Sequence, residues 1–155
     1  MKNKLNKGFT LIELIIVMVI LGIMAAVAVP KYIDSIANAE ESAENAVISS
    51  IRAGLKQHAN NSLYSDGRAT WPDNPFEVLG DAPAGYSATD NGLDGNGLEQ
   101  LDGVADSDGE WTFDYGNSRI THQRADNTRY SWAYDKGTQT GDNAGIGSLG
   151  GRQDL

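Results

Sequence analysis

The stretch from Lys7 to Tyr32 reads KGFTLIELIIVMVILGIMAAVAVPKY, and it decides how the rest of the chain is organised. Between Phe9 and Val29 it holds 21 residues with a single charge, that of Glu13. A hydrocarbon core about 30 Å thick needs roughly 20 helical residues, so this run is long enough for one membrane span. A lone carboxylate costs about 2.5 kcal/mol or more at mid-bilayer and less near the interface. Glu13 therefore needs either a partner or a shallow position.

Three interpretations compete for this N-terminal segment. A cleaved secretory signal has an apolar region of about 7–15 residues that ends at a small-residue site, whereas the run here is longer and continues into more helix-forming sequence. An ordinary signal anchor explains the lysines at positions 2, 4 and 7 by the positive-inside rule, but it does not explain Glu13. An α-amino group created by cutting the chain nearby would supply the carboxylate with a positive partner on another chain.

The sequence GFTLIE after a short basic leader resembles the processing motif of type IV prepilins and pseudopilins. Gly8 precedes Phe9, and Glu13 is the fifth residue counted from Phe9. The resemblance covers about residues 1–35. Further positions that resemble the N-terminal helix of that family are Gly22, Pro30 and Tyr32.

The resemblance implies a processing and assembly scheme. A membrane peptidase would cut between Gly8 and Phe9 on the cytoplasmic side and methylate the new amine of Phe9. Glu13 would then pair with the amine of a neighbouring subunit during assembly; the alternative is that Glu13 only reaches up to the membrane interface. Gly22 and Pro30 weaken the helix. They mark either a fixed bend or a segment that melts when subunits pack.

Length and composition set the domain organisation. The chain has 155 residues, a net charge of −9 and no cysteines, so the prior is one domain plus an extension, with no disulfides to stabilise it. We expect a cleaved basic leader at 1–8 and a transmembrane and assembly helix at 9–30. The remainder, 31–155, is expected to hold the amphipathic half of the helix and a globular head with a flexible C-terminal tail.

The pattern after Pro30 predicts an α+β fold in which one long N-terminal helix packs against a small antiparallel sheet, as in pilins. Apolar residues from Ile33 to Leu55 recur at helical spacing while Glu44 and its acidic neighbours are expected to face out, so the helix should run from about Phe9 to His58. Asn74 followed by Pro75 indicates the start of a short helical turn that packs Trp71, Phe76 and Leu79. Period-two patterns at 110–116, 118–124 and 128–134 predict about three strands, with one face on the helix and the other solvated.

The region from Asp81 to Asp114 holds nine acidic residues and neither lysine nor arginine. Such a surface repels phosphate backbones, so we expect no nucleic-acid binding there. Glycines let the loop curl, and calcium prefers six to eight oxygen ligands, but no register fits an EF-hand. We expect no cofactor, with a structural calcium ion as the alternative. Its candidate ligands are Asp90, Asp94, Asn96, Asp102, Asp106 and Asp108.

The charged residues outside this loop indicate no catalytic site. His58 and His122 are far apart in sequence and are expected to be polar surface residues, and no Ser/His/Asp or metal-hydrolase spacing is visible. We therefore expect no enzyme activity. The region after Asp114 is more basic, which suggests charge contacts between neighbouring subunits that tune register rather than affinity. Its bases up to residue 136 are Arg119, Arg124, Arg129 and Lys136.

The family resemblance favours a structural subunit of a type IV pilus-like filament that polymerises through its N-terminal helix. A type II secretion pseudopilin and a minor pilin are alternatives, and a non-polymerising, membrane-anchored binding protein is a further one. The partners implied are copies of itself and related pilins, the prepilin peptidase and an inner-membrane assembly platform. The precursor would cross the bacterial inner membrane once before entering an extracellular pilus, or a periplasmic pseudopilus.

Overall fold

The computed structural model describes residues 8–89, 103–138 and 146–155. Helix α1 spans Leu11–Asp66, and the 3₁₀ helix η1 spans Pro75–Val78. The strands are β1 (Trp111–Asp114), β2 (Arg119–Gln123), β3 (Arg129–Asp135) and β4 (Ser148–Asp154). Contacts divide the chain into two units, Met1–Ala43 and Glu44–Leu155, and the second unit is the head.

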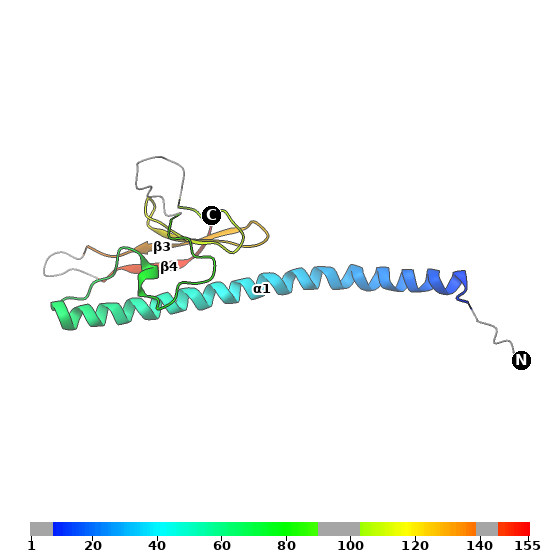
Figure 1. Cartoon of the computed structure of the whole chain (residues 1–155), viewed down its shortest axis with the longest axis horizontal. Coiled ribbons are helices and arrows are strands. Elements are labelled where there is room, and N and C mark those ends of the chain that lie inside the picture. Colours follow the sequence, from blue (N-terminus) through cyan, green and yellow to red (C-terminus); the bar gives the residue numbers. More distant parts are fainter. Residues whose placement is uncertain (1–7, 90–102, 139–145) are drawn as a thin grey trace, which may run out of the picture. The chain divides into compact units, whose positions relative to one another are not determined.

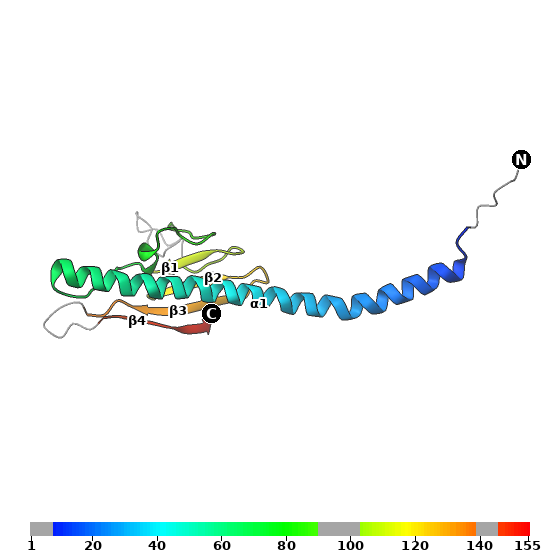
Figure 2. The same cartoon turned by 90° about the horizontal axis from the view of Figure 1, so that it is seen from below.

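The four strands form one antiparallel sheet in the order β1-β2-β3-β4, so each strand pairs with its neighbour in sequence. The strands lie side by side along the part of α1 that belongs to the head (Figures 1 and 2). The expected α+β class, one long helix packed on a small antiparallel sheet, is confirmed. The turns between strands place Ser118 and Asn127 at positive φ, 51° and 63°, which short polar residues tolerate better than branched ones.

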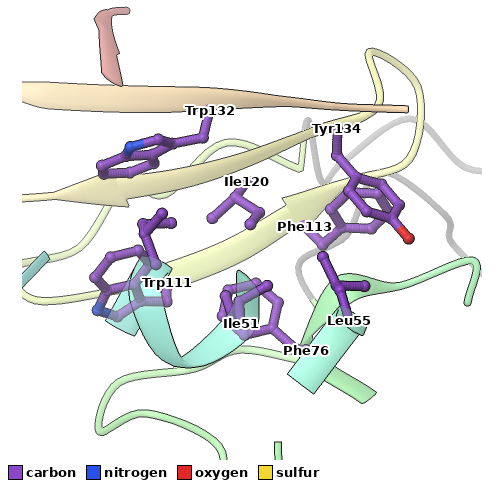
Figure 3. Packing of buried hydrophobic residues seen from close by; sticks show 9 residues of the cluster. Ile51, Leu55, Phe76, Trp111, Phe113, Ile120, Trp132 and Tyr134 are labelled. Atoms are coloured by element: carbon purple, nitrogen blue, oxygen red, sulfur yellow. The ribbon is translucent and has the colours of Figure 1, made fainter. Parts of the chain in front are cut away.

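The core of the head lies between α1 and the sheet. Ile51 and Leu55 project from the helix toward Phe113 and Ile120 of the sheet, with Phe76 of η1 closing one side (Figure 3). Aromatic rings fill much of the remaining space: Trp111 stacks on Trp132 with centroids 5.6 Å apart. Burial of apolar side chains of this size contributes roughly 1.5–3 kcal/mol each, so this contact surface holds the helix and sheet together.

The helical turn expected after Asn74 is present as η1. The Asn74 side chain accepts a hydrogen bond from the backbone N–H of Phe76 at 2.9 Å, and Pro75 occupies the first helical position. Gly54 on α1 permits the close approach of η1, because a Cβ at this position would lie 2.6 Å from Cγ2 of Val78. Phe76 is buried, and Trp71 and Leu79 are partly buried against the core, as expected.

Helix α1 is longer than expected. It continues past His58 to Asp66, and Gly67 follows with φ of +74°, a conformation typical of the residue after a helix C-terminus. Ala59 and Ser62 are buried in the added turns. The two asparagines at 60 and 61 do not end the helix, because tertiary packing of this stripe outweighs their low helix propensity.

The C-terminal segment was expected to be a flexible tail, and over its last residues this expectation is wrong. Ser148–Asp154 forms β4, which pairs with β3 along the sheet edge. Gly147 makes the approach possible, because a Cβ there would lie 1.8 Å from the carbonyl oxygen of Asp135. Leu149 packs against the core, and Arg52 of α1 donates a hydrogen bond to the carbonyl oxygen of Gly150 at 2.7 Å.

The sheet face away from α1 was expected to be solvated, but its middle is covered. Thr112 and Thr121, neighbours on β1 and β2, are both buried with their hydroxyl oxygens 2.6 Å apart. The backbone N–H of Ala105 donates to Oγ1 of Thr121 at 2.7 Å, and Oγ1 of Thr112 donates to the carbonyl oxygen of Gly103 at 2.5 Å. The chain just before β1 therefore folds over this face and satisfies its polar side chains.

Candidate processing and assembly site

The N-terminal site is built around the first turn of α1. Gly8 and Phe9 precede the helix, and the Phe9 side chain is 90% exposed. Thr10 caps the helix together with Glu13. The Thr10 N–H and hydroxyl donate to Oε2 of Glu13 at 2.8 and 2.7 Å, and the Glu13 N–H donates to Oγ1 of Thr10 at 3.3 Å. This reciprocal arrangement is a capping box, which satisfies backbone donors that the first helical turn leaves free.

The capping box gives Glu13 a partner within its own chain, which the sequence analysis missed. The signal was present in the spacing T-x-x-E from Thr10 to Glu13, typical of helix starts. The carboxylate also lies at the same helix end as Phe9. Phe9 and Glu13 thus lie near the same end of α1, and the pairing of Glu13 with the Phe9 amine of a neighbouring subunit remains a prediction.

Gly22 and Pro30 lie within α1, which continues through both positions. A Cβ at Gly22 would meet no heavy atom within 4 Å inside this chain. Pro30 removes one backbone donor from the helix ladder. Pro30 therefore leaves a gap in the backbone hydrogen bonds of α1, and the role of both residues in flexibility remains a prediction.

The first part of α1 presents apolar side chains all around its axis. The helix is long and apolar enough to cross a membrane, and none of its apolar stretch is buried within this chain. A helix that is apolar on every side is typical of burial in lipid or among other helices. Either environment would cover a surface that this chain alone leaves open.

A second polar site lies inside the head and was not foreseen. Glu44 was expected to face out, but its side chain is fully buried. Nε and Nη2 of Arg124 donate to Oε1 and Oε2 of Glu44 at 2.6 and 2.8 Å, and Nη1 of Arg152 donates to Oε2 at 3.1 Å. Nδ1 of His122 lies 3.1 Å from Oε1. The carboxylate thus connects α1 to β2, to the residue after β2, and to β4.

Electrostatics explain how this carboxylate stays charged inside the protein. Burial raises the pKa of Glu44, but hydrogen bonds from Arg124, His122 and Arg152 outweigh burial and hold that pKa at about 2. The two guanidinium groups also lie over the ring of Tyr130, 4.2 and 4.8 Å from its centroid. This set, Glu44 with its three donors, is called the Glu44 cluster below.

The expectation that both histidines are polar surface residues is wrong. His122 is buried rather than on the surface and stacks on Trp111 with centroids 4.2 Å apart. His58 is half-buried and hydrogen-bonds to the carbonyl oxygen of Thr70 through Nδ1 at 3.0 Å. In sequence, Glu44 precedes Ile48 by four residues and is therefore in register with the buried stripe of α1. That spacing was the available signal.

The basic residues after Asp114, which were expected to make charge contacts between neighbouring subunits, have partners inside the head, and the contacts between subunits remain a prediction. Arg124 belongs to the Glu44 cluster, and Lys136 pairs with Asp73. The other pairs are Arg119 Nε with Asp114 Oδ2 at 2.9 Å and Arg129 Nε with Gln123 Oε1 at 2.7 Å. These charges fix loops and strands within one chain.

The calcium candidate lies largely outside the described residues. Asp90, Asp94, Asn96 and Asp102 belong to the undescribed range 90–102. Asp106 and Asp108 are described and exposed, and Asp106 accepts a hydrogen bond from the Ser107 hydroxyl at 3.1 Å. Within 8–89, 103–138 and 146–155, no group of three or more His, Cys, Asp or Glu side chains is placed to hold a metal ion.

Comparison with known proteins adds to this geometry. The model of the prokaryotic N-terminal methylation motif matches residues 3–29. The type IV major fimbrial protein FimA of Dichelobacter nodosus is 39% identical over 109 residues, 70% of this chain and 57% of that protein. The fimbrial protein EcpC of Eikenella corrodens is 42% identical over 93 residues, 59% of this chain and 52% of that protein. A type IV major pilin protein PilE1 of Neisseria gonorrhoeae is 44% identical over 72 residues, which is 46% of this chain and 40% of that protein.

The extent of these matches is informative. The chain spans about half the length of the curated relatives that it matches. Among solved structures, none is a significant match. Because α1 ends at Asp66, a match of 109 residues also includes part of the head that follows the helix. The chain thus shares the N-terminal methylation motif and, over up to 109 residues, is similar to type IV fimbrial proteins.

Proposed function

We propose that this chain is a structural subunit of a type IV pilus-like filament. The observation that carries the proposal is the similarity to fimbrial proteins over 109 residues, more than the leader and α1 together contain. The methylation motif by itself covers residues 3–29 and does not separate pilins from secretion pseudopilins. The relatives are named as fimbrial and pilin proteins, which favours the pilus over the pseudopilus.

Maturation would begin at the exposed backbone before the helix. A prepilin peptidase cuts between Gly8 and Phe9 and methylates the amine of Phe9. Two observations support this step: both residues precede α1 and are exposed, so the peptide bond is accessible without unwinding the helix. Cleavage removes the basic leader, which holds the three N-terminal lysines, and turns Phe9 into a cationic chain end.

Assembly would use the carboxylate of Glu13, which lies in the first turn of α1. Glu13 accepts from Thr10 in the single chain, and a carboxylate can accept further hydrogen bonds. In a filament the methylated amine of a neighbouring Phe9 adds a charge-assisted bond to it, and such bonds gain strength in a low dielectric. The exposed apolar side chains of α1 are buried in the same step, which supplies the non-specific part of the driving force.

The position of Pro30 and Gly22 in α1 supports a local loss of helix during packing. In a helix interior, glycine lowers the stability of the helix by roughly 1 kcal/mol relative to alanine, and proline lowers it by roughly 3 kcal/mol. The segment between these two residues would thus unwind at less cost than the rest of α1. A fixed bend is the competing interpretation.

The proposed path of the subunit follows from these parts. The precursor inserts once into the bacterial inner membrane, is cut by the peptidase and is taken up by an assembly platform. The mature subunit then joins copies of itself and related pilins in an extracellular pilus. The proposal assigns the chain no catalytic role and no nucleic-acid ligand.

Mass spectrometry of fibres sheared from the cell surface tests the proposal. We expect the subunit to be recovered there with Phe9 as its first residue, bearing one methyl group. Recovery of the subunit only from periplasmic filaments would support the pseudopilin instead. A mature form that retains Met1, or one cut near Ala25–Ala28, would overturn the processing scheme.

A further inference from the structure

A pocket of about 630 Å³ opens at one end of the sheet, outside the processing site and the Glu44 cluster. It lies between the β1–β2 turn, the end of β3 and the loop that carries Asp73. This volume is within the ~300–1,000 Å³ that small-molecule pockets usually have. The lining residues within the described part of the chain belong to the head unit.

The inner wall of the pocket is aromatic. Phe113 and Tyr134 are buried and pack edge to face, with centroids 5.6 Å apart (Figure 3). Tyr115 is half-buried at the rim and packs edge to face on Phe113 at 4.7 Å. The Tyr134 hydroxyl donates to the carbonyl oxygen of Pro72 at 2.6 Å. Tyr134 is therefore fixed in place, and the wall is rigid and mostly apolar.

The rim is polar and carries both donors and acceptors. Lys136 forms an ion pair with Asp73 beside the opening. The Asp135 carboxylate accepts a hydrogen bond from the N–H of Gly137 at 2.8 Å and keeps lone pairs for other donors. Ser118 is exposed in the β1–β2 turn, and its hydroxyl both donates and accepts.

The distribution of charge selects among ligand classes. A charged ligand of either sign would meet both attraction and repulsion, because the rim carries the carboxylates of Asp73 and Asp135 beside the ammonium group of Lys136. A neutral ligand with many hydroxyl groups meets no such repulsion, because each hydroxyl can donate to a carboxylate or accept from an ammonium group. A pyranose ring also has an apolar C–H face that suits an aromatic wall.

We propose that this pocket binds a neutral saccharide, with the C–H face of one sugar ring against Tyr115 and its hydroxyls on Asp135, Lys136 and Ser118. One such site in an open pocket gives weak affinity, in the millimolar range. If the chain polymerises as proposed above, repeated display on a filament would raise the overall avidity. Binding by the single chain does not depend on that polymerisation.

Saturation-transfer NMR on the full-length chain in micelles of a detergent without sugar groups tests this proposal. The probes are glucose, galactose and N-acetylglucosamine, with N-acetylneuraminic acid as the anionic comparator and ethanolamine as the cationic one. We expect signal transfer to the ring protons of at least one neutral sugar and weaker transfer to both charged comparators. Tyr115→Ala should weaken the affinity about tenfold, because it removes the stacking surface.

Matched variants separate a binding role from a folding role. Tyr64→Ala makes the same chemical change at a tyrosine that is 89% exposed at the end of α1, and it should bind like the wild type. Ser118→Gly removes one hydroxyl at a position whose φ of 51° glycine adopts without strain, so the fold is kept and the affinity should fall severalfold. Transfer to none of the neutral sugars, equal binding by all variants, or preference for a charged comparator would overturn the proposal.

Discussion

Glu44 of α1 and Arg124, the residue directly after β2, form a two-pronged ion pair inside the head. Their nitrogen–oxygen distances are 2.6 and 2.8 Å, and both side chains are buried. The pair joins residues 80 positions apart in sequence. Two parallel hydrogen bonds fix the orientation of the guanidinium as well as its distance, so this contact sets how the helix and sheet are aligned.

Removing the charge of Glu44 should destabilise the head strongly. In Glu44→Gln, Arg124 would remain buried without the carboxylate that accepts its two hydrogen bonds, and breaking a buried pair in this way costs about 3–5 kcal/mol. Urea denaturation of the full-length chain in micelles, followed by tryptophan fluorescence, measures the loss. Asp108→Asn, the same carboxylate-to-amide change at an exposed site, is the control and should stay within about 0.5 kcal/mol. Equal stability of both variants would show that the Glu44 cluster does not hold the head together.

The Glu44 cluster also predicts how stability depends on pH. Glu44 has a folded pKa of about 2, below the ordinary value of 4.5. Its contribution is therefore complete above pH 4.5 and is lost as the pH falls toward 2, which amounts to about 3 kcal/mol. Denaturation midpoints of the wild type should drop over this interval more steeply than those of Glu44→Gln. Parallel pH profiles for the two proteins would contradict this assignment.

Two glycines test the place of β4 in the sheet. Gly147 directly precedes the strand, and Gly151 lies within it. In Gly147→Ala the new Cβ would collide with the carbonyl oxygen of Asp135, whereas a Cβ at Gly151 meets nothing within 4 Å. We expect Gly147→Ala to release β4, so that limited proteolysis cuts the chain before Ser148 much faster than in the wild type. Gly151→Ala should be cut at the wild-type rate. If both variants are equally resistant, β4 does not need the close approach at Gly147.

The capping box makes a prediction for the start of α1. Thr10→Val keeps the shape of the side chain but removes the hydroxyl that bonds to Glu13. The first helical turn should lose about 1 kcal/mol of stability, seen as faster hydrogen exchange of the amides that follow Thr10 in micelles. Thr10→Ser restores the hydroxyl and should exchange like the wild type. Slow exchange in the valine variant would mean that lipid or detergent, rather than the cap, protects this turn.

Local patterns accounted for much of the fold. The uninterrupted apolar run predicted the first half of α1, period-two alternation predicted β1 to β3, and Asn74 before Pro75 predicted η1. Each of these signals is local, since it depends on the spacing of side chains along one element. The glycine-rich β4 lacked such a signal, because glycine is depleted in strands and Ser148–Asp154 has no apolar alternation.

The parts of the site that sequence reasoning missed depend on tertiary contacts. Glu44 looks like a surface residue until Arg124, which follows β2, and Arg152 of β4 are placed beside it, and a buried charge is rare without such partners. The covered outer face of the sheet likewise depends on how the chain before β1 folds back. Thr10 is different, because its spacing to Glu13 was a readable capping signal, although the two residues lie in a segment with a stronger apolar pattern.

The assembly role of Glu13 is the central claim. It predicts that Glu13→Gln spares membrane insertion and cleavage, since an uncharged span is at least as well accommodated in lipid, but that it removes the charged partner of the Phe9 amine. The outcome of losing this pair is a subunit that matures and then fails to enter the filament.

The most direct measurement is the amount of tagged Glu13→Gln subunit in sheared fibres, divided by the amount of processed subunit in the membrane of the same cells. The control is Thr10→Ser, which leaves the carboxylate in place. We expect this ratio to fall at least about tenfold for Glu13→Gln, as loss of a charge-assisted contact of about 1.5–3 kcal/mol implies, and to be unchanged for the control. A Glu13→Gln subunit that is processed and incorporated at the wild-type ratio would contradict the account.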